Sequence, residues 1–448
     1  MESELNICTK SGAYALGNAF FLGAILAPLL LCTTAYSLPA RADLPTFYGQ
    51  QFVREGKSWP DGRPPVAVPA LTENVQVPKQ EYQRQLNEFE LMGGPYADNL
   101  AEPLLGLGRY YTSEGDYEGA VRFYRRALHI VRLNDGLYSE RQAPVVRELL
   151  NAVRIAGDFQ SLDDRYDYFF RLYGNGEPPY TELRMRASIE YLRWQREALR
   201  LGFDGGEKKR LLNLYTLNED LLAATRATGS YDQGAQWDLT LSQVRNLYLL
   251  QSRVTPRVVI SGGTSRSPFY STSAQGNDMD FDQQRLEAIQ HNVLSRGRAV
   301  LEQYAAAETV IEHKARAMVE LGDWYQWYGS YRQARGYYEA AFTMLDEAGE
   351  GKLLQAWFGS PVELPDNGAF WQPERLQRGD SYNVVEATFD VSPTGRVKNI
   401  SVATPDAGVD ANVTRFRRKL AATRFRPQYE SGEAVAAEGL ARKYELYD

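Results

Sequence analysis

The sequence predicts a mainly α-helical protein, in which an α-solenoid of about five stacked helical hairpins precedes a small α+β domain with the order β-β-α-β. Three observations carry this prediction. Apolar and small residues recur at helical intervals from about residue 81 to residue 350. Two stretches of that region share the same residues at a set of equivalent offsets, and an alternation of apolar and polar residues replaces the helical period after residue 381.

The composition is that of an ordinary globular chain, and its charge excludes one class of partner. The chain has 448 residues, of which 44% are hydrophobic and 24% charged, and its length predicts two or three domains at about 150 residues each. Fifty Lys and Arg residues against fifty-seven Asp and Glu residues leave a net charge of -7. No positive potential of the whole molecule is available to hold a polyanion, so binding to nucleic acid is not expected.

The segment 1–42 is expected to meet a membrane, as a signal peptide or as an anchor. No charged side chain lies between Lys10 and Arg41, and the densely apolar run from Ala19 to Leu31 is shorter than the about 20 residues that a spanning helix needs. Small residues flank Arg41, so cleavage after Ala42 is the leading prediction. The alternative is an uncleaved anchor, because the looser uncharged stretch is long enough to span a bilayer. Either outcome places the rest of the chain outside the cytoplasm.

The segment 43–80 is expected to be a linker. It is turn-rich, and proline blocks helix formation at Pro45, Pro60, Pro64, Pro65, Pro69 and Pro78. Both cysteines, Cys8 and Cys32, lie before this linker. The remainder of the chain is therefore expected to hold no disulfide and no thiolate metal site.

Two units of the helical region have identical residues at a set of equivalent positions. The matching residues are Leu107, Gly108, Gly115, Tyr117, Ala120, Tyr124 and Ala127 in the first unit, and Leu321, Gly322, Gly329, Tyr331, Ala334, Tyr338 and Ala341 in the second. The first glycine of each unit lets two helices approach closely, and the second permits a tight turn between them. The Tyr and Ala rows recur at helical intervals, so each hairpin is expected to bury its apolar face against a neighbour.

These units resemble the tetratricopeptide repeat, except that Arg132 stands where the usual proline closes the first unit. Degenerate relatives of the pattern lie between them, at Gly157–Phe159 and Gly229–Tyr231. The resemblance implies a helical repeat domain over residues 81–350, in which the first helix of each hairpin lines a concave groove. By position, the residues that it implies for peptide contact are Arg109, Thr112, Asp323, Gln326 and Trp327.

A different and smaller domain is predicted for residues 381–448, after a linker at 351–380 that is marked by prolines. Alternating apolar residues from Val385 to Val391 predict a strand, and a turn at Ser392–Gly395 returns the chain in a second strand over residues 396–403. Asp410 is placed to cap a helix with the apolar stripe Val413, Phe416 and Leu420. A last strand is predicted over residues 440–447.

The stretch 381–448 resembles the C-terminal domain of the TonB energy-transducer family. The resemblance rests on Gly395–Val397, on the arginine-rich helix that runs into Arg424–Pro427, and on Gly432–Val435 before the closing strand. In that family the domain is periplasmic, and a strand near its C-terminus pairs with a short peptide of an outer-membrane receptor. By position, the pairing strand implied here is Leu440, Ala441, Arg442, Lys443, Tyr444, Glu445 and Leu446. The alternative is that this strand simply completes the sheet.

One local cluster of positive charge stands out against the acidic background. It comprises Arg415, Arg417, Arg418, Lys419, Arg424 and Arg426. One interpretation is the solvated face of the predicted helix. The other is a contact with an anionic envelope surface or an acidic partner peptide, which predicts a salt-sensitive interaction.

The sequence predicts no catalytic residue, no cofactor and no metal site. Three histidines, His129, His291 and His313, have no cysteine partners and no paired helical spacing, which makes a zinc site unexpected. The chain has no Gly-x-Ser-x-Gly elbow, no Walker loop and no dinucleotide fingerprint.

We therefore expect a non-catalytic scaffold or adaptor of the periplasm, with protein or peptide partners in the cell envelope, an outer-membrane protein among them. The alternative is a TonB-type energy transducer that relays force to an outer-membrane receptor, anchored in the inner membrane by segment 1–42. That alternative lacks the family's histidine in the membrane segment and its long Pro-rich spacer. A third hypothesis is an envelope enzyme that uses scattered carboxylates.

Overall fold

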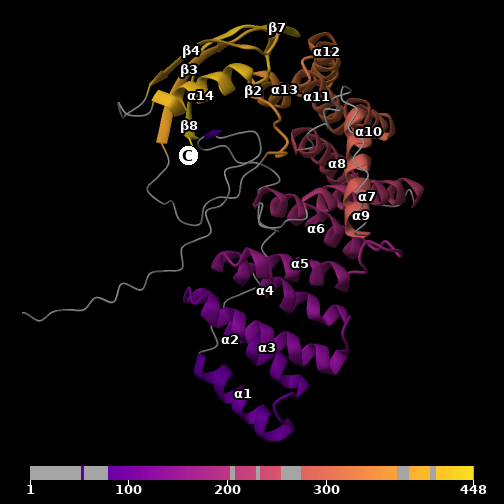
Figure 1. The fold of residues 1–448 in the computed structure, drawn as a ribbon, viewed down its shortest axis with the longest axis vertical. Coiled ribbons are helices and arrows are strands. Elements are labelled where there is room, and N and C mark those ends of the chain that lie inside the picture. Colours follow the sequence, from indigo (N-terminus) through magenta and orange to yellow (C-terminus); the bar gives the residue numbers. More distant parts are fainter. Residues whose placement is uncertain are drawn as a thin grey trace, which may run out of the picture. The chain divides into compact units, whose positions relative to one another are not determined.

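The computed structural model describes residues 52–54, 79–201, 207–228, 233–253, 274–370, 383–403 and 410–446 (Figure 1). Within these ranges the chain is mainly helical and ends in a small β-rich region, which confirms the coarse fold class predicted from the sequence. The predicted membrane-directed segment 1–42 lies outside the described residues. So does the predicted linker 43–80, apart from β1 (Phe52–Arg54) and the first two residues of α1 (Lys79–Gly93).

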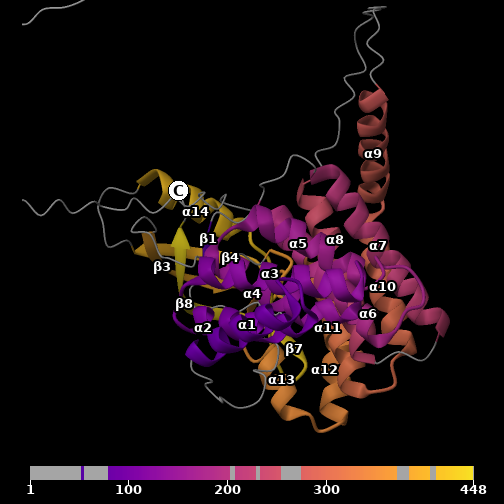
Figure 2. The same ribbon diagram turned by 90° about the horizontal axis from the view of Figure 1, so that it is seen from below.

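Helices follow one another from residue 79 to residue 358 and contact their neighbours in the sequence. After α1 they are α2 (Ala101–Ser113), α3 (Tyr117–Asp135), α4 (Ala143–Ala156), α5 (Phe159–Leu172), α6 (Glu182–Leu201), α7 (Glu207–Thr228), α8 (Gln233–Arg253), α9 (Ala274–His291), α10 (Val293–Ala307), α11 (Ile311–Trp327), α12 (Tyr331–Glu347) and α13 (Gly351–Phe358). Short 3-10 turns, η2 (Asp98–Leu100) and η3 (Glu140–Gln142), precede α2 and α4. Figure 2 shows α9 at the edge of this region, where it contacts α7, α8 and α10.

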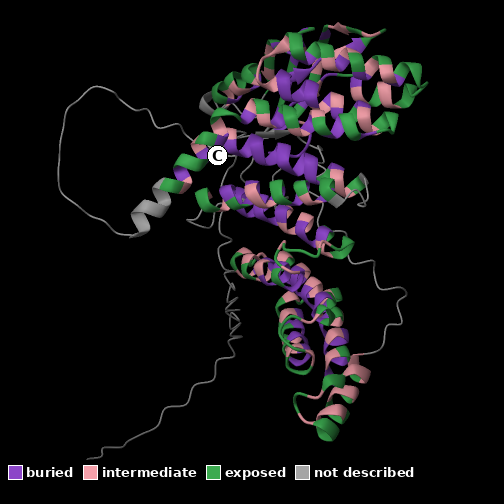
Figure 3. Ribbon diagram, turned by 90° about the vertical axis from the view of Figure 1, so that its right-hand side faces the viewer, coloured by how far each residue is buried: buried purple, intermediate pink, exposed green. Residues whose placement is uncertain are grey.

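The helices bury the sides that face one another (Figure 3). One apolar cluster joins α2 through α6, and a second joins α6 through α11. Aromatic rings link helices within these clusters: the ring of Tyr166 in α5 stacks on that of Trp194 in α6 at 4.8 Å, and the ring of Tyr248 in α8 meets that of Trp324 in α11 edge-on at 4.6 Å. The apolar core therefore continues from one helix pair to the next.

The two units that match in sequence also match in structure. A β-carbon added to Gly108 of α2 would lie 2.3 Å from the ring of Tyr124 in α3, and one added to Gly322 of α11 would lie 2.3 Å from the ring of Tyr338 in α12. The turns between the helices use Gly115 and Gly329 at φ of +78° and +77°, which residues with a side chain rarely adopt. The repeated glycines thus mark one packing arrangement that the chain uses twice.

The C-terminal region is an antiparallel sheet covered by one helix. Its elements are β3 (Asn383–Val391), β4 (Val397–Ala403), α14 (Asp410–Ala422), β5 (Phe425–Arg426), β6 (Gln428–Glu430), β7 (Glu433–Val435) and β8 (Ala437–Leu446). The strand order in the main sheet is β1-β8-β3-β4. Val385, Ala387, Phe389 and Val391 of β3 are buried with Phe416 and Leu420 of α14, so the alternation and the helical stripe face one core.

The segment expected as a linker, 351–380, has a defined structure in its described part. It forms α13 and then β2 (Val362–Glu363), which pairs antiparallel with β5. Leu364, Asn367, Ala369 and Phe370 are buried. Residues 361–370, which we call the clasp segment, therefore contribute to the packed core rather than connect two separate bodies.

The repeated glycines yield a first test. Replacing Gly108 or Gly322 by alanine is expected to lower the free energy of unfolding by about 1–3 kcal/mol, because the added methyl group displaces a buried tyrosine ring. Gly336 is the matched control. It is exposed within α12 and has no atom within 4 Å of an added β-carbon, so Gly336→Ala is expected to stabilise by up to about 1 kcal/mol. Urea unfolding of the three variants measures this; equal effects at Gly108 and Gly336 would contradict the close approach.

Candidate functional site

The face of α11 on which Asp323 lies is occupied by the C-terminal region of the same chain. The Asp323 carboxylate accepts two hydrogen bonds from the guanidinium group of Arg426 in β5, from Nε at 2.8 Å and from Nη2 at 2.5 Å. The hydroxyl group of Tyr338 donates to the same carboxylate at 2.8 Å. The side chains of Asp323 and Arg426 are only 2% and 5% exposed. A buried ion pair is tolerated when its geometry is bidentate and further hydrogen bonds satisfy it, as here.

The charges of this pair support each other. Burial works against the charge of Arg426, but the attraction of Asp323 outweighs it and raises the pKa of the guanidinium group. Burial, followed by the negative charge of Asp323, raises the pKa of Tyr338 well above its usual value. The phenol therefore stays protonated and remains a donor to the carboxylate.

Gln326, one turn further along α11, holds two backbone segments with one amide group. Its Nε2 donates to the carbonyl oxygen of Thr394 at 2.8 Å and to that of Phe425 at 2.9 Å. Gly395 fits beside them only because it lacks a side chain: an added β-carbon would lie 1.9 Å from the Phe425 carbonyl oxygen. Gln326 thus holds the turn at 392–395 and strand β5 by the backbone carbonyl groups of these two segments.

Trp327 completes this face by packing on the aromatic core. Its ring meets that of Tyr248 in α8 edge-on at 4.8 Å and lies 6.4 Å from that of Phe370 in the clasp segment. Asp323, Gln326 and Trp327, which the repeat resemblance implied as contacts to a partner peptide, therefore contact residues of their own chain. In this conformation the buried Asp323 and Gln326 are not accessible to another protein.

The equivalent face of α2 is more open. Arg109, at the position of Asp323, keeps 41% of its side chain exposed and pairs through Nε with Oε1 of Glu148 in α4 at 2.9 Å. Thr112, at the position of Gln326, donates to the carbonyl oxygen of Gly108 at 3.0 Å, and its hydroxyl group lies 3.2 Å from that of Tyr124.

Ion pairs continue from this face to the following helices. Arg147 of α4 binds Glu190 of α6 at 2.8 Å, and Arg154 of α4 binds Glu197 of α6 through both guanidinium amino groups. These pairs and Arg109–Glu148 span 43, 43 and 39 residues. We call them the charge ladder. The sequence reasoning missed its members other than Arg109, because each pair joins residues 39 to 43 positions apart in the sequence.

Buried arginines from three elements hold the clasp segment by its backbone carbonyl groups. A buried irregular segment must find partners for these groups, and the arginines supply them. The pairs are Arg200 of α6 with Gly368 and Ala369 at 3.2 and 2.6 Å, Arg245 of α8 with Asn367 at 2.5 Å, and Arg442 of β8 with Pro361 at 2.6 Å. The clasp segment thereby links the helices to the C-terminal sheet.

Strand β8, implied as the pairing strand at Leu440–Leu446, is an inner strand of the sheet in part of its length. It pairs with β3 from Ala437 to Leu446 and with β1 at residues 444–446. Arg442 and Tyr444 are buried, Leu440 is half-buried, and Ala441 and Lys443 are exposed. The hydroxyl group of Tyr444 donates to Glu363 of β2 at 3.3 Å.

The predicted basic cluster divides between surface and core. Arg415, Arg417 and Arg418 of α14 are exposed, whereas Lys419 and Arg424 are half-buried. Burial, and after it the charge of Arg415, lowers the pKa of Lys419. Arg426 is not part of this surface, because it is buried in its pair with Asp323. Sequence reasoning placed it there because its partner lies 103 residues away.

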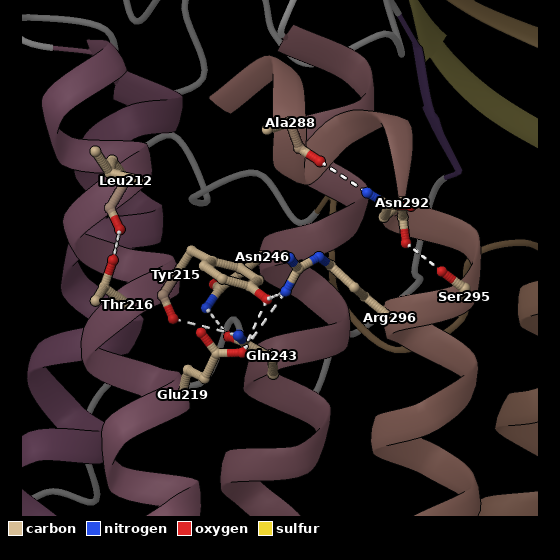
Figure 4. A network of polar contacts seen from close by, with 10 residues as sticks. All are labelled: Leu212, Tyr215, Thr216, Glu219, Gln243, Asn246, Ala288, Asn292, Ser295 and Arg296. Atoms are coloured by element: carbon tan, nitrogen blue, oxygen red, sulfur yellow. Dashed lines mark hydrogen bonds and ion pairs between the residues drawn. The ribbon is translucent and has the colours of Figure 1, made fainter. Parts of the chain in front are cut away.

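A second polar network joins α7, α8 and α10 (Figure 4). Arg296 of α10 donates to the hydroxyl group of Tyr215 in α7 at 2.7 Å and lies 3.8 Å from Glu219. Gln243 and Asn246 of α8 donate to backbone carbonyl groups of α7. These side chains bond mainly to one another and to backbone groups of the three helices. We therefore interpret the network as one that holds these helices together.

Within the described ranges, no group of three or more His, Cys, Asp or Glu side chains is arranged to hold a metal ion. No helix in the part of the chain that the structure covers is both long and apolar enough to cross a membrane. No protein-family model and no curated protein sequence matches the chain.

The contribution of the buried Asp323–Arg426 pair to stability is tested by comparison with the partly exposed Arg109–Glu148 pair. Asp323→Ala is expected to lower the free energy of unfolding by about 3–5 kcal/mol, because it leaves the buried Arg426 without its counter-charge. Arg109→Ala, at the equivalent position, is expected to cost at most about 1 kcal/mol because that ion pair is partly exposed. Urea unfolding measures both losses. Equal losses would show that the α11 face does not depend on the pair.

Glu320 of α11 predicts a pH dependence of stability. Burial, and after it the charge of Asp323, raises the pKa of Glu320 to about 7, while Arg426 and the amide of Asn367 at 3.1 Å oppose this. The folded protein therefore keeps a proton that the unfolded chain releases from about pH 4.5 upward, so this group's contribution to stability falls as the pH rises to about 7. Glu320→Gln keeps the oxygen that Asn367 binds and removes the titration.

The melting temperature of Glu320→Gln is therefore expected to fall less than that of the wild type between pH 5 and pH 8. The exposed Glu312 of the same helix supplies the control Glu312→Gln, which is expected to follow the wild type. Thermal unfolding monitored by circular dichroism at four pH values measures the three curves. Parallel curves for all three proteins would contradict the assignment to Glu320.

Proposed function

We propose that this chain is a non-catalytic scaffold or adaptor of the cell envelope, in which a tetratricopeptide-like helical region binds a protein partner and a TonB-like C-terminal domain engages another. The repeated hairpin pattern and the β-β-α-β order support this proposal. The observation that carries it is that the α11 face already binds polypeptide of its own chain, at Thr394 and at Phe425–Arg426, while the equivalent α2 face keeps Arg109 partly exposed.

The α11 face indicates how such a hairpin recognises its segment. A side-chain amide binds two backbone carbonyl groups, which selects for shape rather than sequence, and a charged residue one turn earlier selects one side chain, Arg426. On α2 the charged residue is Arg109, so the sign of the selected charge is reversed. The partner segment expected there carries a carboxylate that competes with Glu148 for Arg109.

The C-terminal region supplies the second surface in this proposal. Strand β8 pairs with β3 over Ala437–Leu446 and, among the described residues, with β1 at residues 444–446 on its other side. In this proposal an extended peptide pairs with β8 through its backbone, as peptides do when they add a strand to a sheet. The exposed arginines of α14 favour an acidic partner or an anionic envelope surface.

The α2 face is tested by site-specific photo-crosslinking in cells that produce the full chain. A benzoylphenylalanine at Thr112 is expected to form discrete adducts with a protein partner, and Arg109→Glu in the same chain is expected to reduce them at least about tenfold, as expected for the loss of a charge-assisted contact. The control carries the crosslinker at Arg125, an exposed position of α3. The same adducts from both positions, or adducts unchanged by Arg109→Glu, would contradict the proposal.

A further inference from the structure

Three arginine side chains gather between α3 and α5, the second helices of two successive hairpins (Figure 1). Arg125 and Arg132 of α3 are seven residues apart, which places them on one side of the helix and about 10 Å apart along its axis. The guanidinium group of Arg132 lies 5.1 Å from the centre of the Tyr168 ring in α5. Arg165 precedes Tyr168 by one helical turn, so its charge lies near the other two.

The three arginines differ from their neighbour Arg126, which forms an ion pair with Glu90 of α1. Within the described ranges, no carboxylate forms an ion pair with Arg125, Arg132 or Arg165. Arg165 is half-buried, and its buried Nε has no hydrogen-bond partner among these residues. A partly buried charge without a partner lowers stability, and an anion close to it reduces that cost.

The charges of the cluster also repel one another. Burial, followed by the positive charge of Arg125, lowers the pKa of Arg165, and the charge of Arg132 adds to this. The exposed Asp164 opposes the lowering without cancelling it. Since the whole chain has a net charge of -7, this gathering of positive charge is local. It indicates a site for an anion.

The cluster matches a phosphoryl group better than a carboxylate. Guanidinium groups bind both anions through paired N–H donors. A carboxylate offers two oxygens and one charge, whereas a phosphate monoester offers three free oxygens and a charge of about −1.5 to −2 at neutral pH. Three guanidinium groups therefore find an acceptor for each of them on one phosphoryl group.

We propose that Arg125, Arg132 and Arg165 form a binding site for the phosphoryl group of a phosphate monoester. The site lies on α3 and α5, so it goes beyond the proposed function, which uses α2 and the C-terminal region. The contact with the ring of Tyr168 holds Arg132 in place by a cation–π interaction. The exposed Arg125 gives the ligand access from solvent.

Exposed apolar side chains lie beside the cluster and bear on which monoester binds. Leu137 and Tyr138, which follow α3, are 48% and 62% exposed. The hydroxyl group of Tyr168 donates to the carbonyl oxygen of Leu137 at 3.2 Å, which places these residues next to Arg132. A lipid monoester would contact both the arginines and these apolar side chains, whereas a soluble monoester would contact the arginines. The phosphoryl chemistry is common to both sources.

Isothermal titration calorimetry of the full chain with glycerol 3-phosphate, in a phosphate-free buffer at constant ionic strength, tests the site. Arg125→Gln with Arg165→Gln removes two of the three charges and leaves Arg132 on Tyr168. We expect this double variant to bind at least about tenfold more weakly than the wild type, because two charge-assisted contacts are lost. Absence of binding to the wild type, or equal affinities of the two proteins, would overturn the proposal.

A single substitution keeps the test valid if the double variant does not fold. Arg125→Gln changes an exposed side chain, so the fold is expected to be retained, and circular dichroism checks this. We expect its affinity for glycerol 3-phosphate to fall about threefold or more, since one of the charge-assisted contacts is lost. An unchanged affinity would remove Arg125 from the site and overturn the proposed cluster.

The exposed arginines of α14 supply the matched control. Arg415→Gln with Arg418→Gln removes the same charge from another basic surface and is expected to leave the affinity unchanged. Equal losses in the two double variants would show that the anion responds only to net charge, which would contradict a site on α3 and α5. Succinate, a dicarboxylate, is expected to bind the wild type more weakly than glycerol 3-phosphate. Equal affinities for the two anions would overturn the assignment to a phosphoryl group.

A second titration identifies the source of the phosphoryl group. Dihexanoyl phosphatidate, used below its micelle concentration, carries the phosphate of glycerol 3-phosphate together with two short acyl chains. Tighter binding than glycerol 3-phosphate, reduced by Tyr138→Ser, would assign the site to a lipid headgroup, and equal affinities would assign it to a soluble monoester. In both cases the Arg125 and Arg165 double variant is expected to lose affinity. Phosphatidate binding that does not depend on these arginines would overturn the proposal.

These titrations are independent of the photo-crosslinking on α2. If adducts form on α2 but glycerol 3-phosphate does not bind, the phosphoryl site fails and the scaffold proposal remains. If glycerol 3-phosphate binds through the arginines but no α2 adduct forms, the α2 face fails and the phosphoryl site remains.

Discussion

The structure depends first on the buried ion pair between Asp323 of α11 and Arg426 of β5. Two hydrogen bonds join the charges, Tyr338 donates to the carboxylate, and the carbonyl oxygen of Trp357 accepts from Nη1 of Arg426 at 2.9 Å. These contacts bring the last helical hairpin, α13 and the C-terminal strands to one point. Removing either charge would leave the other buried without a counter-charge, which is strongly destabilising. The pair therefore holds the helical and the β-rich parts in one arrangement.

The two hairpins that match in sequence, α2–α3 and α11–α12, pack in the same way but make different contacts. Gly108 with Tyr124 and Gly322 with Tyr338 set the same approach of two helices, but the residue after the glycine is Arg109 in one copy and Asp323 in the other. Asp323 selects an arginine of its own chain, whereas Arg109 pairs with Glu148 and stays partly exposed. The equivalent positions thus carry opposite charges, one buried against the chain's own Arg426 and one partly exposed.

Local patterns predicted the helical region and the main elements of the C-terminal region. The spacing around Gly322 and the alternation along Val385–Val391 are decided by neighbours in the sequence, so they are visible before folding. The strands β1, β2, β5, β6 and β7 were missed because two or three residues carry no period, and each exists only beside its partner strand. The position of Arg426 was misjudged for the same reason: a cluster of arginines in the sequence does not show which of them meets a distant carboxylate.

The measurement that tests this account most directly is a double-mutant cycle between Asp323 and Arg426. Urea unfolding is compared for the wild type, Asp323→Asn, Arg426→Gln and the double variant, since these amides keep the shapes and some hydrogen bonds. If the pair organises the structure, the coupling energy is expected to be about 2–3 kcal/mol. Losses that add within about 0.5 kcal/mol would show that the two residues act independently and that the C-terminal region is held on α11 by other contacts.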